Sequence, residues 1–319
     1  MKTKTEKTPP KISGAYKMKT SRKSNIEFLL MVLPGTLLAL VFSYIPMFGI
    51  CIAFKSIDYA EGILGSPWVG FKNFQFLFQN PDVYTILRNT IGYNLIFIAV
   101  DVIVPVAIAI MLNQITNKRG AKLYQTIMIL PHFISYVVVS YVVFAFLSYN
   151  LGLLNSSFLP KLGLEPVEWY SKVDLWPFII VFVHTWKGFG YGAVVYLASI
   201  AGIDASLYEA AAIDGATRRQ QTRYILIPEL SNIIIIMTIL AIGRIMSSDF
   251  GLFYNVPMEN GKLFPATNVI STFVYRALKL NGDVGMSSAA GFLQSVVGFI
   301  LVVTTNAIVK RYDESKSLF

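Results

Sequence analysis

The sequence predicts an all-α integral membrane protein with six transmembrane helices in one membrane domain. Apolar residues make up 55% of the 319 residues and charged residues only 14%, an apolar share above the half or so that is usual in soluble domains. The apolar residues are gathered in runs that can cross a hydrocarbon core of about 30 Å as helices, at about 1.5 Å per residue. The net charge is +9, and the basic residues gather at the ends of these runs and in the N-terminal tail. We therefore interpret the basic residues as signals of membrane topology, and we do not expect the chain to bind nucleic acid.

A basic tail precedes the first apolar run. Residues 1–25 contain eight Lys or Arg among Thr, Ser, Pro and Gly, without apolar periodicity. We expect a disordered tail, either solvated or beside an anionic membrane face. Residues 26–54 are almost continuously apolar, a run far longer than the roughly 7–15 residues of a cleaved signal core. They predict a retained spanning helix, bent at Pro34 and Pro46.

Five further runs are long enough to span the membrane. They are residues 90–113, 123–148, 175–200, 225–246 and 287–309. An even number of spans places both termini on one side. The termini and the connections on their side hold 17 Lys and Arg, and the longer connections on the other side hold 8. The positive-inside rule therefore predicts cytoplasmic N- and C-termini, with residues 313–319 as a short C-terminal tail.

The longer connections, predicted to lie outside, contain many aromatic residues. Phe71, Phe74 and Phe78 recur at helical spacing, which suggests a short helix on the outer surface. Asn80 followed by Pro81 predicts the N-cap and first turn of the helix that enters the second span. We expect the tryptophans near the outer ends of spans to be interface anchors. These are Trp68, Trp169 and Trp176.

A polar stretch between the fourth and fifth runs has regular local chemistry. Ser206 and Glu209 have the spacing of a capping box, which predicts the start of a helix. Three alanines extend this helix, and Gly215 can end it in the left-handed conformation. Thr217 and Gln220 repeat the capping-box spacing. We therefore predict two helices joined at a glycine.

The sequence shows no catalytic site, metal site or cofactor site. There is no G-x-x-x-x-G-K-[ST] phosphate loop and no G-x-S-x-G nucleophile elbow. The two histidines, His132 and His184, have no Cys, Asp or Glu at metal-ligand spacing. A single cysteine, Cys51, excludes intrachain disulfides. The chain is not expected to act as an enzyme by itself.

Three ionisable residues lie within the predicted spans: Asp101, Lys187 and Arg244. Charges at this depth usually face a bundle interior or a wet cavity, so each is a candidate for the substrate pathway. Asp101 could instead be paired or protonated in a contact between helices. Arg244 could extend its charged end to the interface.

The surroundings of Lys187 favour a cavity. It follows Trp186 and is succeeded by three closely spaced glycines, which are Gly188, Gly190 and Gly192. We expect these glycines to loosen the helix, and irregular backbone at membrane depth is tolerated only within protein or beside water.

The polar stretch resembles the signature cytoplasmic loop of a known family, the membrane-spanning permease subunits of binding-protein-dependent ABC importers. That loop reads E-A-A-x-x-D-G-A with a proline further on, and here it is Glu209 to Ala216 with Pro228 at the expected distance. Other segments resemble the carbohydrate branch of the family, close to its polysaccharide-type permeases. These are Asn89-Thr90, Leu130-Pro131, Trp186-Lys187, residues 196–204, Tyr275-Arg276 and Asn306. The resemblance covers about residues 26–312.

The resemblance implies a type I ABC importer permease fold over residues 26–312, with a cytoplasmic coupling loop at residues 201–228. In this family the loop sits in a groove of an ATPase, and ATP-driven closure of two ATPases rocks two permease subunits between inward-open and outward-open states. The residues expected to couple to the ATPase are Glu209, Ala210, Ala211, Asp214, Gly215, Ala216 and Arg218. Glu209 is expected both to cap its helix and to contact the ATPase. Positive-inside anchoring also explains Arg218, Arg219 and Arg223, and we prefer it for Arg223.

The implied function is that of a permease subunit in a bacterial cytoplasmic membrane, forming half of a heterodimeric channel for a carbohydrate, in particular an oligosaccharide. Its expected partners are a second permease, two ATP-binding subunits and an external solute-binding protein. The candidate pathway residues are Asp101, Trp186, Lys187, Arg244, Asp249 and Gln294. One alternative is an importer of peptides or amino acids. Another is a self-contained secondary transporter or membrane enzyme, which should show inverted repeats or a catalytic constellation; neither is visible in the sequence.

Overall fold

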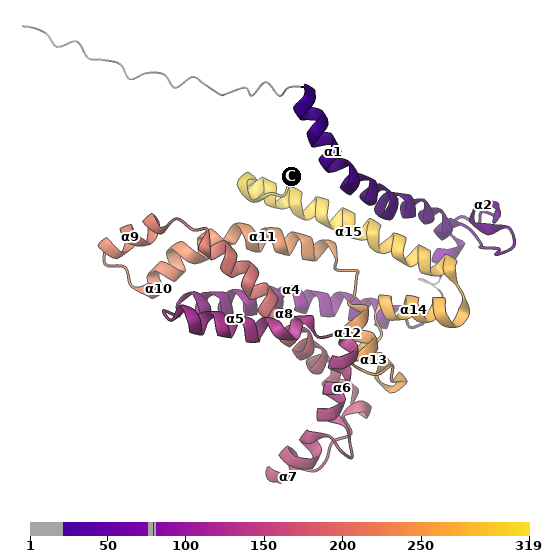
Figure 1. The fold of residues 1–319 in the computed structure, drawn as a ribbon. Helices are drawn as coiled ribbons and strands as arrows, with labels where there is room; N and C mark the ends of the chain where they lie inside the picture. Colours follow the sequence, from indigo (N-terminus) through magenta and orange to yellow (C-terminus); the bar gives the residue numbers. More distant parts are fainter. Residues whose placement is uncertain (1–21, 76–78, 80) are drawn as a thin grey trace, which may run out of the picture. The chain divides into compact units, whose positions relative to one another are not determined.

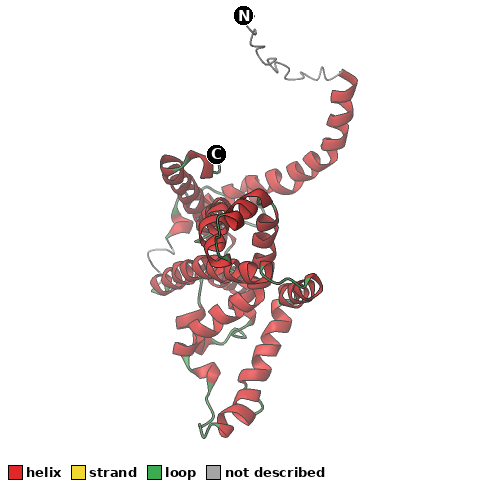
Figure 2. Cartoon of the chain, turned by 90° about the vertical axis from the view of Figure 1, so that its left-hand side faces the viewer, coloured by secondary structure: helices red, strands yellow, loops and turns green. Residues whose placement is uncertain are grey.

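A computed structural model describes residues 22–75, 79 and 81–319. Within these residues all regular secondary structure is helical, apart from an isolated antiparallel bridge between Lys55 and Trp68 (Figure 2). The chain divides into two units, Met1–Ile50 and Cys51–Phe319.

Five described helices are long and apolar enough to cross a membrane. They are Ile26–Phe54, Val83–Asn113, Val173–Ala201, Arg218–Gly243 and Val284–Tyr312. A bent pair of helices, Lys118–Phe133 and Tyr136–Leu147, makes a sixth span if the two are counted together. All six predicted runs therefore correspond to helical segments, and the all-helical fold is confirmed.

The first unit contains α1, Arg22–Ala39, with Pro34 inside it. The helix continues as a π-helical turn, Leu40–Tyr44, and then as a 3-10 helix, Ile45–Phe54, which runs past the end of this unit and has Pro46 as its second residue. The proline at position 46 thus lies where the helical pitch changes, and a change of pitch of this kind interrupts the regular hydrogen-bond ladder.

The second unit is built around the long helices in Figure 1. These are α4 (Val83–Asn113), α5 (Lys118–Phe133), α6 (Tyr136–Leu147), α8 (Trp176–Ala201), α11 (Ile227–Gly243) and α15 (Val284–Tyr312). The shorter α-helices are α2 (Gly62–Gly65), α7 (Leu159–Lys161), α9 (Ala205–Ile213), α10 (Arg218–Gln221), α12 (Phe250–Asn255), α13 (Phe264–Thr267) and α14 (Ile270–Asn281). The remaining turns of 3-10 or π-helix are Lys72–Phe74, Leu154–Phe158, Trp169–Ser171, Val173–Leu175, Thr222–Leu226, Gly261–Leu263 and Glu314–Lys316.

The third apolar run is not the continuous helix that we predicted. It bends by 99° between α5 and α6. Pro131 lies in the last turn of α5, where it removes one backbone donor, and the amide of Ile134 bonds to the Pro131 carbonyl at 3.2 Å to close the turn. Ser135 then starts α6 as its N-cap, accepting from the Val138 amide at 3.3 Å. A proline followed by a capping serine outweighs the apolar continuity of the run.

The glycines after Lys187 do not loosen the helix, so that prediction was wrong. α8 stays helical from Trp176 to Ala201. A Cβ on Gly190 would lie 1.9 Å from the carbonyl oxygen of Met128 on α5, and one on Gly192 would lie 2.8 Å from the Pro105 ring on α4. These glycines allow α8 to approach α5 and α4 closely, a use of small residues that is common between membrane helices.

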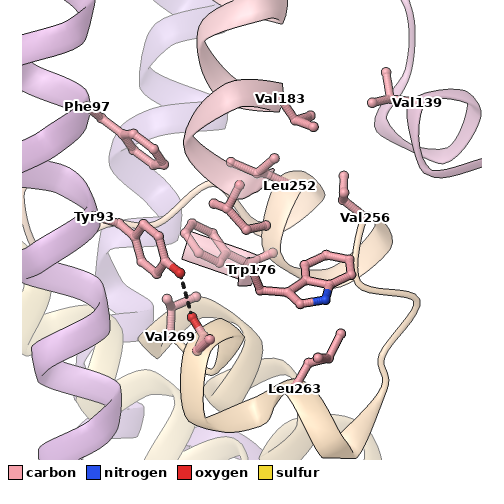
Figure 3. Packing of buried hydrophobic residues seen from close by; sticks show 12 residues of the cluster. Tyr93, Phe97, Val139, Trp176, Val183, Leu252, Val256, Leu263 and Val269 are labelled. Atoms are coloured by element: carbon pink, nitrogen blue, oxygen red, sulfur yellow. Dashed lines mark hydrogen bonds between the residues drawn. The ribbon is translucent and has the colours of Figure 1, made fainter. Parts of the chain in front are cut away.

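A buried cluster lies where α4, α6 and α8 meet the segment 250–270 (Figure 3). Trp176 is fully buried there, and its indole N–H donates to the Trp169 carbonyl at 2.9 Å. Trp176 is therefore a core residue, and the prediction that it is an interface anchor was wrong. Trp68, in contrast, is 67% exposed. The hydroxyl of Tyr93 on α4 donates to the Ala266 carbonyl at 2.8 Å, which fixes the segment against the long helix.

The segment before α4 differs from its prediction. Lys72–Phe74 form a 3-10 turn at the start of the expected short helix, and residues 76–78 of that helix lie outside the described residues, as does Asn80. α4 begins at Val83 after Asp82, so Pro81 is not in its first turn. The rings of Phe71 and Phe74 pack against the ring of Phe54 at centroid distances of 5.6 and 5.5 Å.

The residues after α15 fold back along the helix. The buried side chain of Asn306 accepts from the Leu318 amide at 2.7 Å and donates to the Phe319 carbonyl at 2.9 Å. Both polar atoms of this amide are thus satisfied by main-chain groups twelve and thirteen residues further on. The 3-10 turn Glu314–Lys316 packs against α15 and α11.

Candidate functional site

The predicted coupling segment begins with α9, but its cap differs from the one expected. The side chain of Asp204 accepts from the Ser206 amide at 2.9 Å and makes Asp204 the N-cap. This hydrogen bond lowers the pKa of Asp204 below its ordinary value. The predicted capping box of Ser206 and Glu209 is therefore wrong: the helix starts one residue before Ser206, so both residues already lie inside it.

Gly215 ends α9 as the sequence predicts. Its φ is +79°, a left-handed conformation that side chains with a Cβ rarely adopt. The amide of Ala216 bonds to the Ala211 carbonyl at 2.8 Å, and that of Gly215 bonds to the Ala212 carbonyl at 3.1 Å. These two bonds form a Schellman motif, which satisfies carbonyls that the helix end would otherwise leave unpaired.

The predicted capping box at Thr217 is confirmed. The Gln220 amide donates to the Thr217 hydroxyl at 3.4 Å, and the Gln220 side chain accepts from the Thr217 amide at 2.8 Å. The helix that starts here continues through a π-helical turn, Thr222–Leu226, into α11. Together they form one span, Arg218–Gly243, which begins before the predicted residue 225. The second helix of the coupling segment is therefore the end of a membrane helix.

The motif residues lie at the surface of the chain. Glu209, Ala210, Asp214, Gly215 and Arg218 are exposed, and Ala211 and Ala216 are half-buried. The apolar side chain of Ile213, in the same turn, is 85% exposed. Small, apolar and charged groups are thus available together to a partner.

The predicted pathway residue Lys187 lies on one face of α8 together with three residues that were not predicted to line the pathway. His184, Lys187, Gly188 and Tyr191 have the i, i+3, i+4 and i+7 spacing of a single helical stripe. The Nε2 atom of His184 lies 3.1 Å from both carboxylate oxygens of Asp101 on α4. In the part of the chain that the structure describes, no third His, Cys, Asp or Glu completes a metal site here.

His184 was not among the predicted pathway residues. Its ring stacks on Phe97 at a centroid distance of 3.7 Å, and it holds Asp101, whose side chain is 51% exposed. Asp101 is thus paired between helices while its carboxylate remains accessible. The position of His184 one helical turn before Lys187 is the signal that could have identified it.

Lys187 and Asp249 are linked through Tyr136. The Lys187 ammonium donates to the His132 carbonyl at 2.6 Å and lies 4.9 Å from the centroid of the Tyr136 ring. The Tyr136 hydroxyl donates to Asp249 at 2.6 Å. The other carboxylate oxygen of Asp249 accepts from the Leu252 amide at 3.2 Å and caps α12. This arrangement connects the break between α5 and α6 to the break between α11 and α12.

The other predicted pathway residues have different surroundings. Trp186 lies against the buried cluster and lines an apolar hollow of about 590 Å³ between α6 and α8. Gln294 donates to the Met246 carbonyl at 2.7 Å and so supports the chain after α11. Arg244 follows the last residue of α11 and is exposed.

Comparison with known proteins gives consistent results. Residues 102–314 match the family of binding-protein-dependent transport system inner membrane components. The protein LplB of Bacillus subtilis (strain 168) is 33% identical over 285 residues, which cover 89% of each chain. The polygalacturonan/rhamnogalacturonan transport system permease protein YteP of the same organism is 34% identical over 285 residues, covering 89% of this chain and 88% of YteP.

A solved structure supports the same fold. A chain of a bacterial ABC transporter involved in the import of the acidic polysaccharide alginate superposes with a TM-score of 0.81 and 31% identity, covering 91% of this chain and 97% of that chain. The family resemblance seen in the sequence is thereby confirmed, and so is the type I permease fold. The chain belongs to the binding-protein-dependent transport system inner membrane components, as a membrane-spanning permease subunit of an ABC importer.

Proposed function

We propose that this chain is one of two permease subunits of a carbohydrate importer, and that its substrate is an oligosaccharide. Relatives that cover most of the chain are named for polygalacturonan/rhamnogalacturonan and for arabinooligosaccharides, and the similar solved transporter imports alginate. The exposed Asp101 carboxylate and the polar groups around Lys187 supply the hydrogen-bonding groups that sugar hydroxyls need.

The observation that carries the coupling role is the continuity of α10 with α11. α9 is capped at its start by Asp204 and closed at its end by the Schellman motif, so it can move as a rigid body. The helix after Gly215 runs without interruption from Arg218 to Gly243 across the membrane. A force applied to the exposed motif by a partner ATPase would therefore reach the spanning helix directly.

Two further parts of the proposal concern orientation and partners. The excess of Lys and Arg supports a cytoplasmic position in a bacterial cell for the coupling segment and both termini, where ATP-binding subunits would meet them. The second similar structure is an alginate transporter in complex with a periplasmic protein that holds an alginate pentasaccharide. We assign a solute-binding protein of the same kind to the outer side of this chain.

The test of the coupling role is the substitution Gly215→Val in the importer reconstituted into proteoliposomes. Valine disfavours a φ of +79°, so α9 should lose its closed end and the importer should lose most of its substrate-stimulated ATP hydrolysis. Gly202→Ala is the matched control because Gly202 has a φ of −86° at the end of α8. Wild-type ATP hydrolysis in the Gly215→Val importer would refute the coupling role.

The substrate class is tested separately. The solute-binding protein of this importer should bind oligosaccharides and leave peptides and amino acids unbound, as measured by isothermal titration calorimetry. Binding of a peptide with no sugar binding would instead indicate a peptide importer.

A further inference from the structure

A half-polar hollow of about 220 Å³ lies where three segments of the chain meet. These are the end of α4 with the link that follows it, the middle of α9, and the start of the span that begins at Arg218. The hollow is thus walled on one side by the coupling segment and on the other by the connection between α4 and α5.

The side chains that line the hollow are mainly hydrogen-bond donors with one positive charge. Arg218 supplies the charge, and amides and hydroxyls come from Asn113, Thr116 and Gln221. Among the described residues that line it, none is an Asp or a Glu. A guanidinium beside neutral donors matches the oxygens of a phosphate group, to which arginine can donate two hydrogen bonds at once.

The wall is held in place by local hydrogen bonds. The Thr222 hydroxyl donates to the Arg218 carbonyl at 3.0 Å, and the Gln221 side chain donates to the Ala216 carbonyl at 3.3 Å. The capping box at Thr217 fixes the turn that carries Arg218. Within the described part of the chain, the guanidinium itself has no hydrogen-bond or ion-pair partner, so it remains available to a ligand.

The hollow lies at the ends of two spanning helices. The second candidate span ends at Asn113 and the fifth begins at Arg218, and in a bilayer the headgroup region lies just beyond the ends of the spanning segments. Lys118, Arg119 and Arg223 lie close by in the sequence, and basic residues near a membrane surface attract anionic headgroups. Ile115 and Leu226 give the same hollow an apolar side suited to the glycerol and first methylenes of a lipid.

We infer that this hollow binds a phosphate group, as carried by an anionic phospholipid headgroup, with Arg218 as the principal ligand. Its place beside the coupling segment means that a bound headgroup would brace the start of the fifth span against the connection between α4 and α5. Arg218 then acts on the membrane side of the segment, in addition to any contact with an ATPase.

The test uses the importer complex in neutral detergent, with its lipids exchanged for phosphatidylcholine. Added phosphatidylglycerol should raise the Tm of the permease pair, and Arg218→Met should abolish that rise. Arg219→Met is the matched control, because Arg219 carries the same charge but does not line the hollow. Thr222→Val, which alters the wall without removing the charge, should reduce the rise. Native mass spectrometry should show one tightly held phosphatidylglycerol fewer in Arg218→Met than in Arg219→Met.

Soluble ligands distinguish the source of the phosphate. A rise in Tm with inorganic phosphate or glycerol phosphate that needs Arg218, without a response to phosphatidylglycerol, would assign the hollow to a free phosphate compound. Equal responses of Arg218→Met and Arg219→Met to every phosphate would overturn the inference. Gly215→Val should keep the lipid-dependent rise even where it loses coupling, so failure of the coupling role and failure of the phosphate site give different results.

Discussion

The ammonium of Lys187 donates to the carbonyl oxygen of His132 at 2.6 Å. In an unbroken helix this carbonyl would accept from the amide of residue 136, but the 99° bend between α5 and α6 removes that partner. Lys187 therefore completes the end of α5 from a neighbouring helix, and its positive charge lies at the negative end of the α5 dipole. A residue predicted to line the pathway is thus also a brace for a broken span.

Replacement of this lysine should destabilise the break. In Lys187→Met the exposed His132 carbonyl loses its donor while most of the side-chain volume remains, and the loss of such a hydrogen bond costs about 0.5–1.5 kcal/mol. We expect a lower Tm for the detergent-solubilised protein and slower transport. Lys172→Met, at an exposed lysine before α8, is the control and should leave the Tm unchanged. Equal Tm values for both variants would contradict the bracing role.

The close contact at Gly190 predicts an asymmetric effect of two similar substitutions. Gly190→Ala places a Cβ 1.9 Å from the Met128 carbonyl oxygen, so α5 and α8 must separate. Overpacking of this kind costs about 1–3 kcal/mol or more. Gly92→Ala on α4 meets nothing within 4 Å and should be neutral or stabilising by up to about 1 kcal/mol. Thermal unfolding of the two variants in the same detergent measures the difference between their Tm values. Equal Tm values would show that α8 does not pack on α5.

Tyr170 predicts a change of stability at high pH. Its hydroxyl is buried and, within the described residues, has no hydrogen-bond partner. Burial raises the pKa of Tyr170 from 10.0 to about 12. The folded state therefore holds this proton more tightly than the unfolded state, and the associated stability is complete below pH 10 and is lost as the pH rises toward 12.

The substitution Tyr170→Phe should remove this pH dependence. It should also raise the Tm at neutral pH, because a buried hydroxyl without a partner costs about 1 kcal/mol or more. Tyr149→Phe, at a half-exposed tyrosine in the same connection, is the control. The Tm measured from pH 8 to pH 12 tests this, and parallel curves for wild type and Tyr170→Phe would show that Tyr170 is not the titrating group.

Asn306 should control the mobility of the last residues. Asn306→Ala removes the acceptor of the Leu318 amide and the donor to the Phe319 carbonyl. Hydrogen exchange at the Leu318 amide, followed by mass spectrometry, should therefore become much faster. Ser317→Ala removes only a bond within the adjacent turn, from the Ser317 hydroxyl to the Glu314 carbonyl, and should leave this exchange slow. Unchanged exchange in Asn306→Ala would mean that the segment is held by other contacts.

Local rules predicted the coupling segment well because its stabilising groups are neighbours in sequence. The left-handed Gly215 and the reciprocal bonds of Thr217 and Gln220 follow from residue types within a few positions of each other. The error at Ser206 also had a local cause. Asp204, two residues earlier, is an equally good cap, and the helix starts after Asp204 instead of at Ser206.

The surroundings of the candidate pathway residues were predicted less completely because their partners are distant in sequence. Nothing near Asp101 indicates that His184, 83 positions away, will hold it. Likewise, no local pattern connects Tyr136 to Asp249, which lie 113 positions apart. Ionisable type and apolar surroundings identified Asp101, Lys187 and Arg244 as candidates, but the partner that each of them meets depends on how the helices pack.

The sequence by itself determined the helical membrane fold, the six apolar runs and the family motif from Glu209 to Ala216, since hydrophobic length, charge distribution and capping are properties of contiguous residues. Only the tertiary structure decided that the glycines of α8 serve close packing and that Trp176 is buried. Each of these depends on which surface a helix meets, and that is fixed by packing between residues far apart in the chain.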